Sequence, residues 1–117
     1  MDESENRAKR LGMNEALYRQ VNERVADVAE QFTEVETTAS PVGFTCECGD
    51  PGCTQQIEMT LTEYEQIRAE PTRFAVATGH ERPEIERVVD RQPDYLVVEK
   101  HDPEAEEVAL ETDPRSS

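Results

Sequence analysis

The chain has 117 residues, enough for one domain, and its apolar share is 35% with no Trp, which is low for a globular fold. It carries 27 acidic against 12 basic residues, a net charge of −15, so direct binding to nucleic acid or to an anionic membrane is disfavoured. The small core expected from this composition would gain from a staple such as a bound metal ion.

The N-terminal stretch MDESENRAKR is charged and lacks the apolar region of a signal peptide. No apolar run approaches the length that spans a bilayer, so we expect a soluble, cytoplasmic protein. Thiols stay reduced in the cytoplasm, and the odd number of cysteines favours metal or redox chemistry over structural disulfides. We expect residues 1–13, which are polar, to be disordered.

Residues 14–36 predict one long amphipathic helix, with Asn14 as its N-cap. Five apolar side chains recur at spacings of three or four and would share one face: Leu17, Val21, Val25, Val28 and Phe32. We expect this face to pack on the chain's own core. The alternative is self-association, or binding of a protein partner, through this helix. The stretch TTASP at 37–41 predicts a linker.

Residues 42–100 predict a compact module of three to five strands and one short helix. Apolar alternation and turn residues place the strands at 42–46, 54–61, 73–78, 85–90 and 95–100. The last two would form a hairpin, although the first of them would also suit a helical turn.

The short helix of this module would begin at Thr62, because Thr62 and Glu65 fit a capping box, and it would end near Ala69. Residues 101–117 are acidic and poor in apolar side chains, so we expect a disordered tail. The predicted fold class is therefore α+β: a long N-terminal helix, a small mixed module and a disordered acidic tail.

All three cysteines lie in the sequence FTCECGDPGC, at Cys46, Cys48 and Cys53. A turn or bulge in this stretch must bring the thiols to one centre. The glycines and the proline of this stretch suit such a loop.

Three cysteines need a fourth ligand for a closed tetrahedral site, and Cys3His is a standard set for structural zinc. Our candidate is His80, which follows a glycine at the predicted end of a strand. The alternatives are His101, Glu47, Asp50, water or another subunit. Zn²⁺ is the expected metal, and a [2Fe–2S] cluster is the alternative.

Four stretches, NEALYRQVNERV, FTCECGDPGC, LTEYEQIRAEPTRFAVATGHE and YLVVEK, together resemble a group of small, acidic, uncharacterised actinobacterial proteins. The resemblance covers about residues 14–100, and its sharpest parts are the C-E-C-x4-C loop and the G-H-E motif at Gly79, His80 and Glu81. It implies no activity, but it groups the cysteine loop and the histidine as one unit. CDGSH-type [2Fe–2S] proteins also combine three cysteines with one histidine beginning with C-x-C, at a different spacing.

The sequence contains no phosphate-binding loop, no nucleophile elbow and no HExxH motif, and no catalytic residues are assigned. We therefore expect a non-enzymatic, zinc-stapled interaction or regulatory module. The alternative is a thiol- or metal-based redox sensor, and a metal-dependent hydrolase ranks below both.

Overall fold

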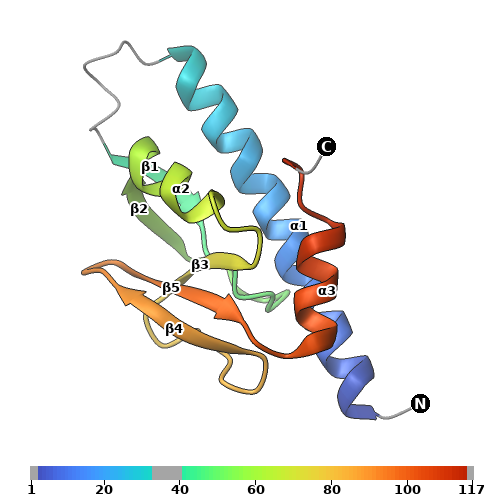
Figure 1. The fold of residues 1–117 in the computed structure, drawn as a ribbon. Coiled ribbons are helices and arrows are strands. Elements are labelled where there is room, and N and C mark those ends of the chain that lie inside the picture. The colour runs from blue at the N-terminus through green and yellow to red at the C-terminus, as the bar shows by residue number, and fades with distance from the viewer. Residues whose placement is uncertain (1–2, 33–40, 116–117) are drawn as a thin grey trace.

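The computed structural model of the chain describes residues 3–32 and 41–115, which form an α+β fold (Figure 1). The elements in chain order are α1 (Glu3–Phe32), β1 (Pro41–Thr45), β2 (Gln56–Thr60), α2 (Leu61–Arg68), β3 (Arg73–Ala77), β4 (Glu86–Arg91), β5 (Tyr95–Lys100) and α3 (Pro103–Glu111). The predicted linker at 37–41 falls outside the described residues, apart from Pro41, which begins β1.

The strands form two antiparallel sheets. β1 and β2 make a hairpin in which Phe44 lies opposite Ile57, and the other sheet has the order β3-β5-β4. In the second sheet Phe74 lies opposite Val98. The predicted hairpin is confirmed, and its first arm is a strand rather than a helical turn because β4 pairs with β5 along its length, with an irregularity after Val88.

The main core lies where the two sheets and α2 meet. The rings of Phe44 and Tyr64 stack with their centroids 4.5 Å apart, and both side chains are fully buried. Phe74, Val76 and Val98 of the second sheet are also fully buried. Cys46 and Cys48 belong to the same cluster, so the cysteine loop lies at the edge of this core.

Helix α2 begins two residues earlier than we predicted. Its N-cap is Thr60, whose hydroxyl accepts a hydrogen bond from the N–H of Glu63 (3.1 Å), while the Glu63 carboxylate accepts one from the N–H of Thr60 (2.8 Å). The capping box at Thr62 and Glu65 was therefore wrong. The helix capped by Thr60 buries Leu61, Tyr64, Ile67 and Arg68.

Residues 103–111 form helix α3, so our prediction of a wholly disordered acidic tail was wrong. Asp102 caps this helix, because its carboxylate accepts hydrogen bonds from the N–H groups of Glu104 (2.9 Å) and Ala105 (3.2 Å). Pro103 lies in the first turn, where an N–H has no partner within the helix. The buried face of α3 consists of Ala105, Val108 and Ala109.

Helix α1 already includes residues 3–13, which we predicted to be disordered. This part packs against α3 (Figure 1): Ala8 is buried in a cluster with Ala105, and a Cβ added at Gly12 would lie 3.4 Å from Cβ of Val108. The two errors have one cause. Each segment is too polar to fold alone, and each supplies the surface against which the other packs.

The long helix packs mainly through the face opposite to its large exposed apolar side chains. Leu17, Val21 and Val28 are 57%, 46% and 52% exposed, Val25 is half-buried, and the side chain of Phe32 lies outside what the structure describes. The prediction that this face packs on the chain's own core was therefore wrong for Leu17, Val21 and Val28, whereas Val25 packs against the core. The buried face carries small and polar side chains instead: Ala8, Gly12, Glu15, Ala16, Arg19, Asn22 and Ala26.

Arg19 can be buried on this face because its guanidinium has fixed partners. It donates hydrogen bonds to the carbonyl oxygens of Pro71 (2.6 Å) and Ala109 (2.8 Å). It also lies over the ring of Phe74, 4.5 Å from the centroid. One side chain of α1 thus ties together the loop after α2, the end of α3 and the second sheet.

Glu15 is buried next to the side chain of Lys100 in β5. The Lys100 Nζ lies 2.5 Å from a carboxylate oxygen of Glu15 and also pairs with Glu86, and all three side chains are fully buried. Burial raises the pKa of Glu15 well above its usual value, although the charge of Lys100 opposes the shift. This buried trio links α1 to β4 and β5.

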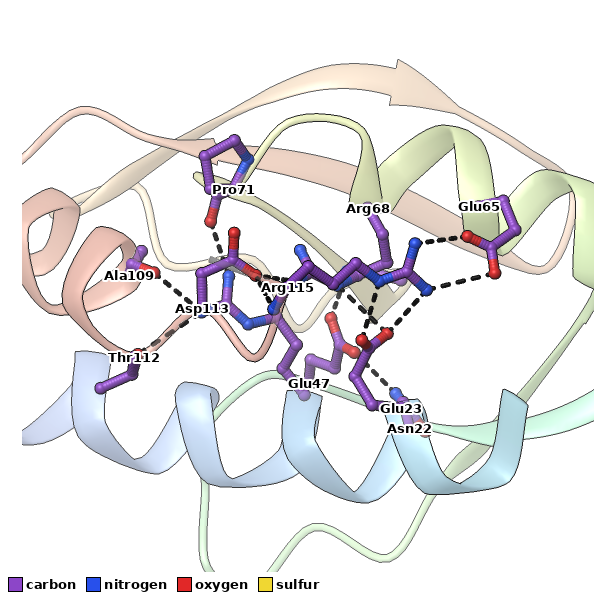
Figure 2. A network of polar contacts seen from close by, with 12 residues as sticks. Asn22, Glu23, Glu47, Glu65, Arg68, Pro71, Ala109, Thr112, Asp113 and Arg115 are labelled. Atoms are coloured by element: carbon purple, nitrogen blue, oxygen red, sulfur yellow. Dashed lines mark hydrogen bonds and ion pairs between the residues drawn. The ribbon is translucent and has the colours of Figure 1, made fainter. Parts of the chain in front are cut away.

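The C-terminal residues are held by an ion-pair network that Figure 2 shows from close by. Arg68 of α2 pairs with Glu23 of α1 (3.4 Å) and with Asp113. Arg115 pairs with Glu23 (2.8 Å) and with Glu65. The chain beyond α3 is therefore anchored to both α1 and α2.

Within residues 3–32 and 41–115, no helix has the length and the apolar character needed to cross a membrane.

Candidate metal centre

The loop that joins β1 to β2 carries all three cysteines. Cys46 directly follows β1, and its N–H donates to the carbonyl oxygen of Gln55 (3.0 Å), which continues the pairing of the hairpin. Gly49 has φ +80°, a conformation that glycine adopts far more readily than other residues. A turn follows it, closed by the N–H of Cys53, which donates to the carbonyl oxygen of Asp50 (2.9 Å), and the predicted loop between Cys48 and Cys53 is therefore present.

A tight turn after β3 positions His80. The N–H of His80 donates to the carbonyl oxygen of Ala77 (2.9 Å), and Gly79 between them has φ +90°. The glycine is needed here for its backbone conformation, since no atom lies within 4 Å of a Cβ added to it. The turn directs the imidazole back towards the cysteine loop.

The structure brings Cys46, Cys48, Cys53 and His80 together as one group. Their possible ligand atoms all lie within 4.8 Å of one another. Nδ1 of His80 is 3.6 Å from Sγ of Cys46 and 3.5 Å from Sγ of Cys53. Four ligand atoms at these separations can hold a metal ion.

The same loop also connects the two sheets. Glu47, between the first two cysteines, pairs with Ala75 of β3: its N–H donates to the Ala75 carbonyl oxygen, and the Ala75 N–H donates to the Glu47 carboxylate, both at 2.9 Å. The N–H of Ala77 donates to Sγ of Cys46 (3.1 Å). The candidate site thus lies at the junction of the β1-β2 hairpin and the second sheet.

Helix α1 packs on the other side of the loop. The side-chain amide of Asn22 donates to the carbonyl oxygen of Thr45 (2.8 Å) and to the carboxylate of Glu47 (2.7 Å). At Gly49 the approach is so close that an added Cβ would lie 2.8 Å from Cγ of Glu15. The position of the cysteine loop therefore depends on the polar face of α1.

Burial raises the pKa of the Cys46 thiol, although the hydrogen bond from the Ala77 N–H opposes the shift. Burial also raises the pKa of Cys48. Both thiols are therefore protonated near neutral pH unless a cation stabilises the thiolates. A metal ion must displace these protons when it binds, so metal affinity will rise with pH.

The structure separates the other possible ligands from this group. His101 is exposed, and its Nε2 lies 3.0 Å from the carbonyl oxygen of Pro83. Glu47 is fully buried and is held by β3 and α1 instead. Asp50 is exposed, and its carboxylate accepts a hydrogen bond from the Gly52 N–H (2.9 Å).

One side of the group faces solvent. Cys53 and His80 are half-buried, whereas Cys46 and Cys48 are each only 2% exposed. A hollow of about 230 Å³ opens at this side, lined by Cys48, Asp50, Gly79, His80, Glu81 and Arg82. A small solute can therefore approach the group from this direction.

Two residues that support the loop were missed by the sequence reasoning. Asn22 anchors the loop to α1, and Arg82 donates from Nε to the carbonyl oxygen of Cys48 (2.9 Å). Asn22 is a residue of low helix propensity within a long predicted helix, which gives no indication of a loop contact. Arg82 lies two residues after His80. The proximity of Arg82 to the G-H-E motif is the one signal that could have suggested its role.

Comparison of the chain with models of known families, with curated proteins and with solved structures found no match.

Proposed function

We propose that Cys46, Cys48, Cys53 and His80 bind one zinc ion, and that this ion stabilises a small non-enzymatic module for protein interaction in the cytoplasm. The observation that carries the proposal is the convergence of the four ligand atoms within 4.8 Å. Three of them come from one loop and the fourth from a turn 27 residues further along the chain.

The spacing of the ligand atoms suits zinc. In a tetrahedral site with Zn–S of about 2.3 Å and Zn–N of about 2.0 Å, sulfur and nitrogen ligands lie about 3.5 Å apart. The separations of 3.6 and 3.5 Å between His80 Nδ1 and the two sulfurs agree with this value. A [2Fe–2S] cluster fits less well, because its two irons would spread the ligand pairs further apart than a single ion does.

The ligand set favours a structural role over catalysis. A catalytic zinc keeps one position open for water or substrate, whereas four protein ligands fill a tetrahedral site. Three thiolates also donate so much charge that the ion becomes a weak Lewis acid. The hydrolase alternative would require one of the four ligands to leave.

The position of the site explains what the ion would stabilise. The loop bonds to β3 through Glu47 and to α1 through Asn22, so an ion in this loop would hold three parts of the fold in place. Structural zinc contributes about 10–16 kcal/mol of apparent binding free energy in small zinc-binding peptides. We expect the metal-free chain to be unfolded or to lose its defined tertiary packing.

The test is the metal content of the full chain purified anaerobically without chelator. We expect one zinc per chain and no visible absorption, whereas an iron–sulfur cluster would give charge-transfer bands. If the folded protein contains no metal and all three thiols react freely, the proposal is wrong.

The histidine assignment has a matched control, because the chain contains two histidines. His80→Ala should weaken zinc retention strongly in a competition with a chromophoric chelator. His101→Ala should retain zinc like the original chain, since His101 lies outside the group. Equal retention by the two variants would contradict the assignment.

A second candidate function is redox sensing, and the partial exposure of Cys53 favours it. Two electrons pass from two of the thiolates to a peroxide, a disulfide forms, and the ion is released as the peroxide is reduced to water or alcohol. Mild peroxide should then eject zinc, and a dithiol reductant should restore binding. If zinc stays bound in the presence of peroxide, the redox-sensing function is wrong and only the structural role remains.

A further inference from the structure

A row of exposed side chains runs along the outward face of α1, and we call it the α1 stripe. Its members follow one another at spacings of three, four, four, three and four residues: Arg10, Met13, Leu17, Val21, Arg24 and Val28. The four apolar members are each 46–57% exposed. In an α-helix this spacing keeps the side chains on one line over about 27 Å.

The α1 stripe is unusual in this chain because it contains no acidic residue, whereas 27 of the 117 residues are acidic. Its two arginines, Arg10 and Arg24, form no ion pair within residues 3–32 and 41–115. Six of the ten other basic side chains are paired with carboxylates: Arg7, Arg68, Arg73, Arg87, Lys100 and Arg115. The α1 stripe is thus a cationic, apolar line on an acidic protein.

We propose that the α1 stripe binds an acidic amphipathic helix of another protein. This inference rests on the interaction role proposed above and names the chemistry of the partner. A second helix can pack its own apolar residues, which recur at the same interval, against Met13, Leu17 and Val21. Carboxylates that flank the partner's apolar line can then pair with Arg10 and Arg24.

Charge argues against the two other occupants. A second copy of the chain would place four arginines of two stripes in one contact, and these like charges would repel one another. An anionic membrane would attract the two arginines but repel the rest of the molecule. An acidic helix of another protein can pair with the two arginines of the α1 stripe. The rest of the partner protein need not approach the acidic surface of this chain.

The probe is a synthetic, fluorescently labelled peptide of three heptads, with leucine at positions a and d and glutamate at positions e and g. A matched peptide carries lysine in place of every glutamate. Binding of both to the zinc-loaded full chain is measured by fluorescence anisotropy. At about 0.15 M salt, which screens the net charge of the chain beyond roughly 8 Å, we expect the glutamate peptide to bind about tenfold more tightly, because two charge pairs are gained with one peptide and two repulsions with the other.

Variants of the α1 stripe separate the contribution of its charges to peptide binding from that of its apolar side chains. Arg10→Glu combined with Arg24→Glu should reverse the preference, so that the lysine peptide binds more tightly. Leu17→Gln combined with Val21→Gln should weaken both peptides. Arg91→Glu is the control, because Arg91 is exposed on β4, away from α1. Circular dichroism and zinc content verify that each variant is folded and loaded.

Three results would overturn the inference: equal affinity for the two peptides, a dimer in sedimentation that Leu17→Gln abolishes, or binding to phosphatidylserine vesicles that depends on Arg10 and Arg24. The zinc content of the same samples keeps the two proposals distinct. A folded, zinc-loaded chain that does not prefer the glutamate peptide contradicts this inference alone. A folded chain without metal contradicts the proposed zinc site, whatever the peptides do.

Discussion

The two faces of α1 reverse the usual arrangement of an amphipathic helix. The face that packs on the protein carries Glu15, Arg19 and Asn22, each fully buried. The face that points to solvent carries Leu17 and Val21, each about half exposed. A charged side chain is costly to bury alone, so the inward face is stable because its polar groups find partners in the fold.

The difference teaches that an apolar stripe shows which residues share a face but not what covers that face. The inward side chains of α1 match fixed groups on four other elements (β1, β3, β5 and α3), including the aromatic ring and carbonyl oxygens around Arg19. Such partners are specific in position, so they determine how the helix is oriented. The outward side chains need only a complementary surface, which another molecule can provide.

The largest effect is expected from removing the charge that neutralises the inward face. Lys100→Ala leaves the carboxylates of Glu15 and Glu86 buried without their cation, and it should lower the free energy of unfolding by about 3–5 kcal/mol. The chain has one other lysine, Lys9, which is exposed on α1. Urea titration measures the free energy of unfolding of both variants. Lys9→Ala should change it little, and an equal loss in the two variants would contradict the expected difference between the buried and the exposed lysine.

A smaller loss is expected at Arg19. Arg19→Leu removes two hydrogen bonds to carbonyl oxygens and the contact with the Phe74 ring, so it should destabilise the protein by about 2–3 kcal/mol. The matched control is Arg24→Leu, five residues further along the same helix and exposed. Thermal unfolding of both variants measures the difference. A loss at Arg24 as large as that at Arg19 would show that the outward face also holds the fold together.

The effect of pH should differ in sign between two glutamates of α1. The folded-state pKa of Glu15 is raised by burial, so its contribution favours folding at low pH and is lost as pH rises through that raised pKa. Glu15→Gln introduces a side chain that is neutral at every pH. The free energy of unfolding of this variant relative to the original chain should therefore be higher at about pH 7.5 than at about pH 5. Urea titrations of both proteins at the two pH values, in the same metal state, measure this change.

Glu23 is the control for that prediction. Burial would raise its pKa, but the hydrogen bonds and the charge of Arg115, together with the charge of Arg68, outweigh burial and lower it. Its contribution is therefore present above its ordinary pKa and is lost as pH falls through the lowered value. Glu23→Gln should destabilise the protein at neutral pH and less so in acid. The same sign for both substitutions would contradict the assigned shifts.

The smallest effect on stability is expected on the outward face. Leu17→Gln should change the free energy of unfolding by no more than about 0.5 kcal/mol, because the side chain is 57% exposed. Differential scanning calorimetry of the zinc-loaded chain measures it. A loss of several kcal/mol would mean that this side chain is covered in solution, whether by the chain itself or by a second copy.

The sequence predicted most of the module between residues 42 and 100 because its signals are local. The turn at Gly49 and the glycine before His80 each follow from backbone chemistry at one position, so the four possible ligands could be named from the residue pattern alone. The start of α2 was less well determined, since both Thr60 and Thr62 have a glutamate three residues later. The structure uses Thr60, a choice that the local residue pattern does not make.

The termini were predicted poorly because their structure depends on each other. Nothing near Ala8 or Gly12 indicates that a helix from the other end of the chain will pack there. The signal for α3 was present in Asp102 and Pro103, a capping residue followed by a helix-starting proline. It was outweighed by the acidic composition of the segment, which is a weaker guide than the cap.

The close contact between Gly49 and α1 has a consequence for protein engineering. The gap between the helix and the cysteine loop is as narrow as a residue without a Cβ allows, and a methyl group there would lie 3.1 Å from the carbonyl oxygen of Leu11. The loop is therefore not a portable motif that can be grafted onto another hairpin. Its transplantation would require a flat polar helix surface beside it, and a designer would have to move α1 together with the ten residues between β1 and β2.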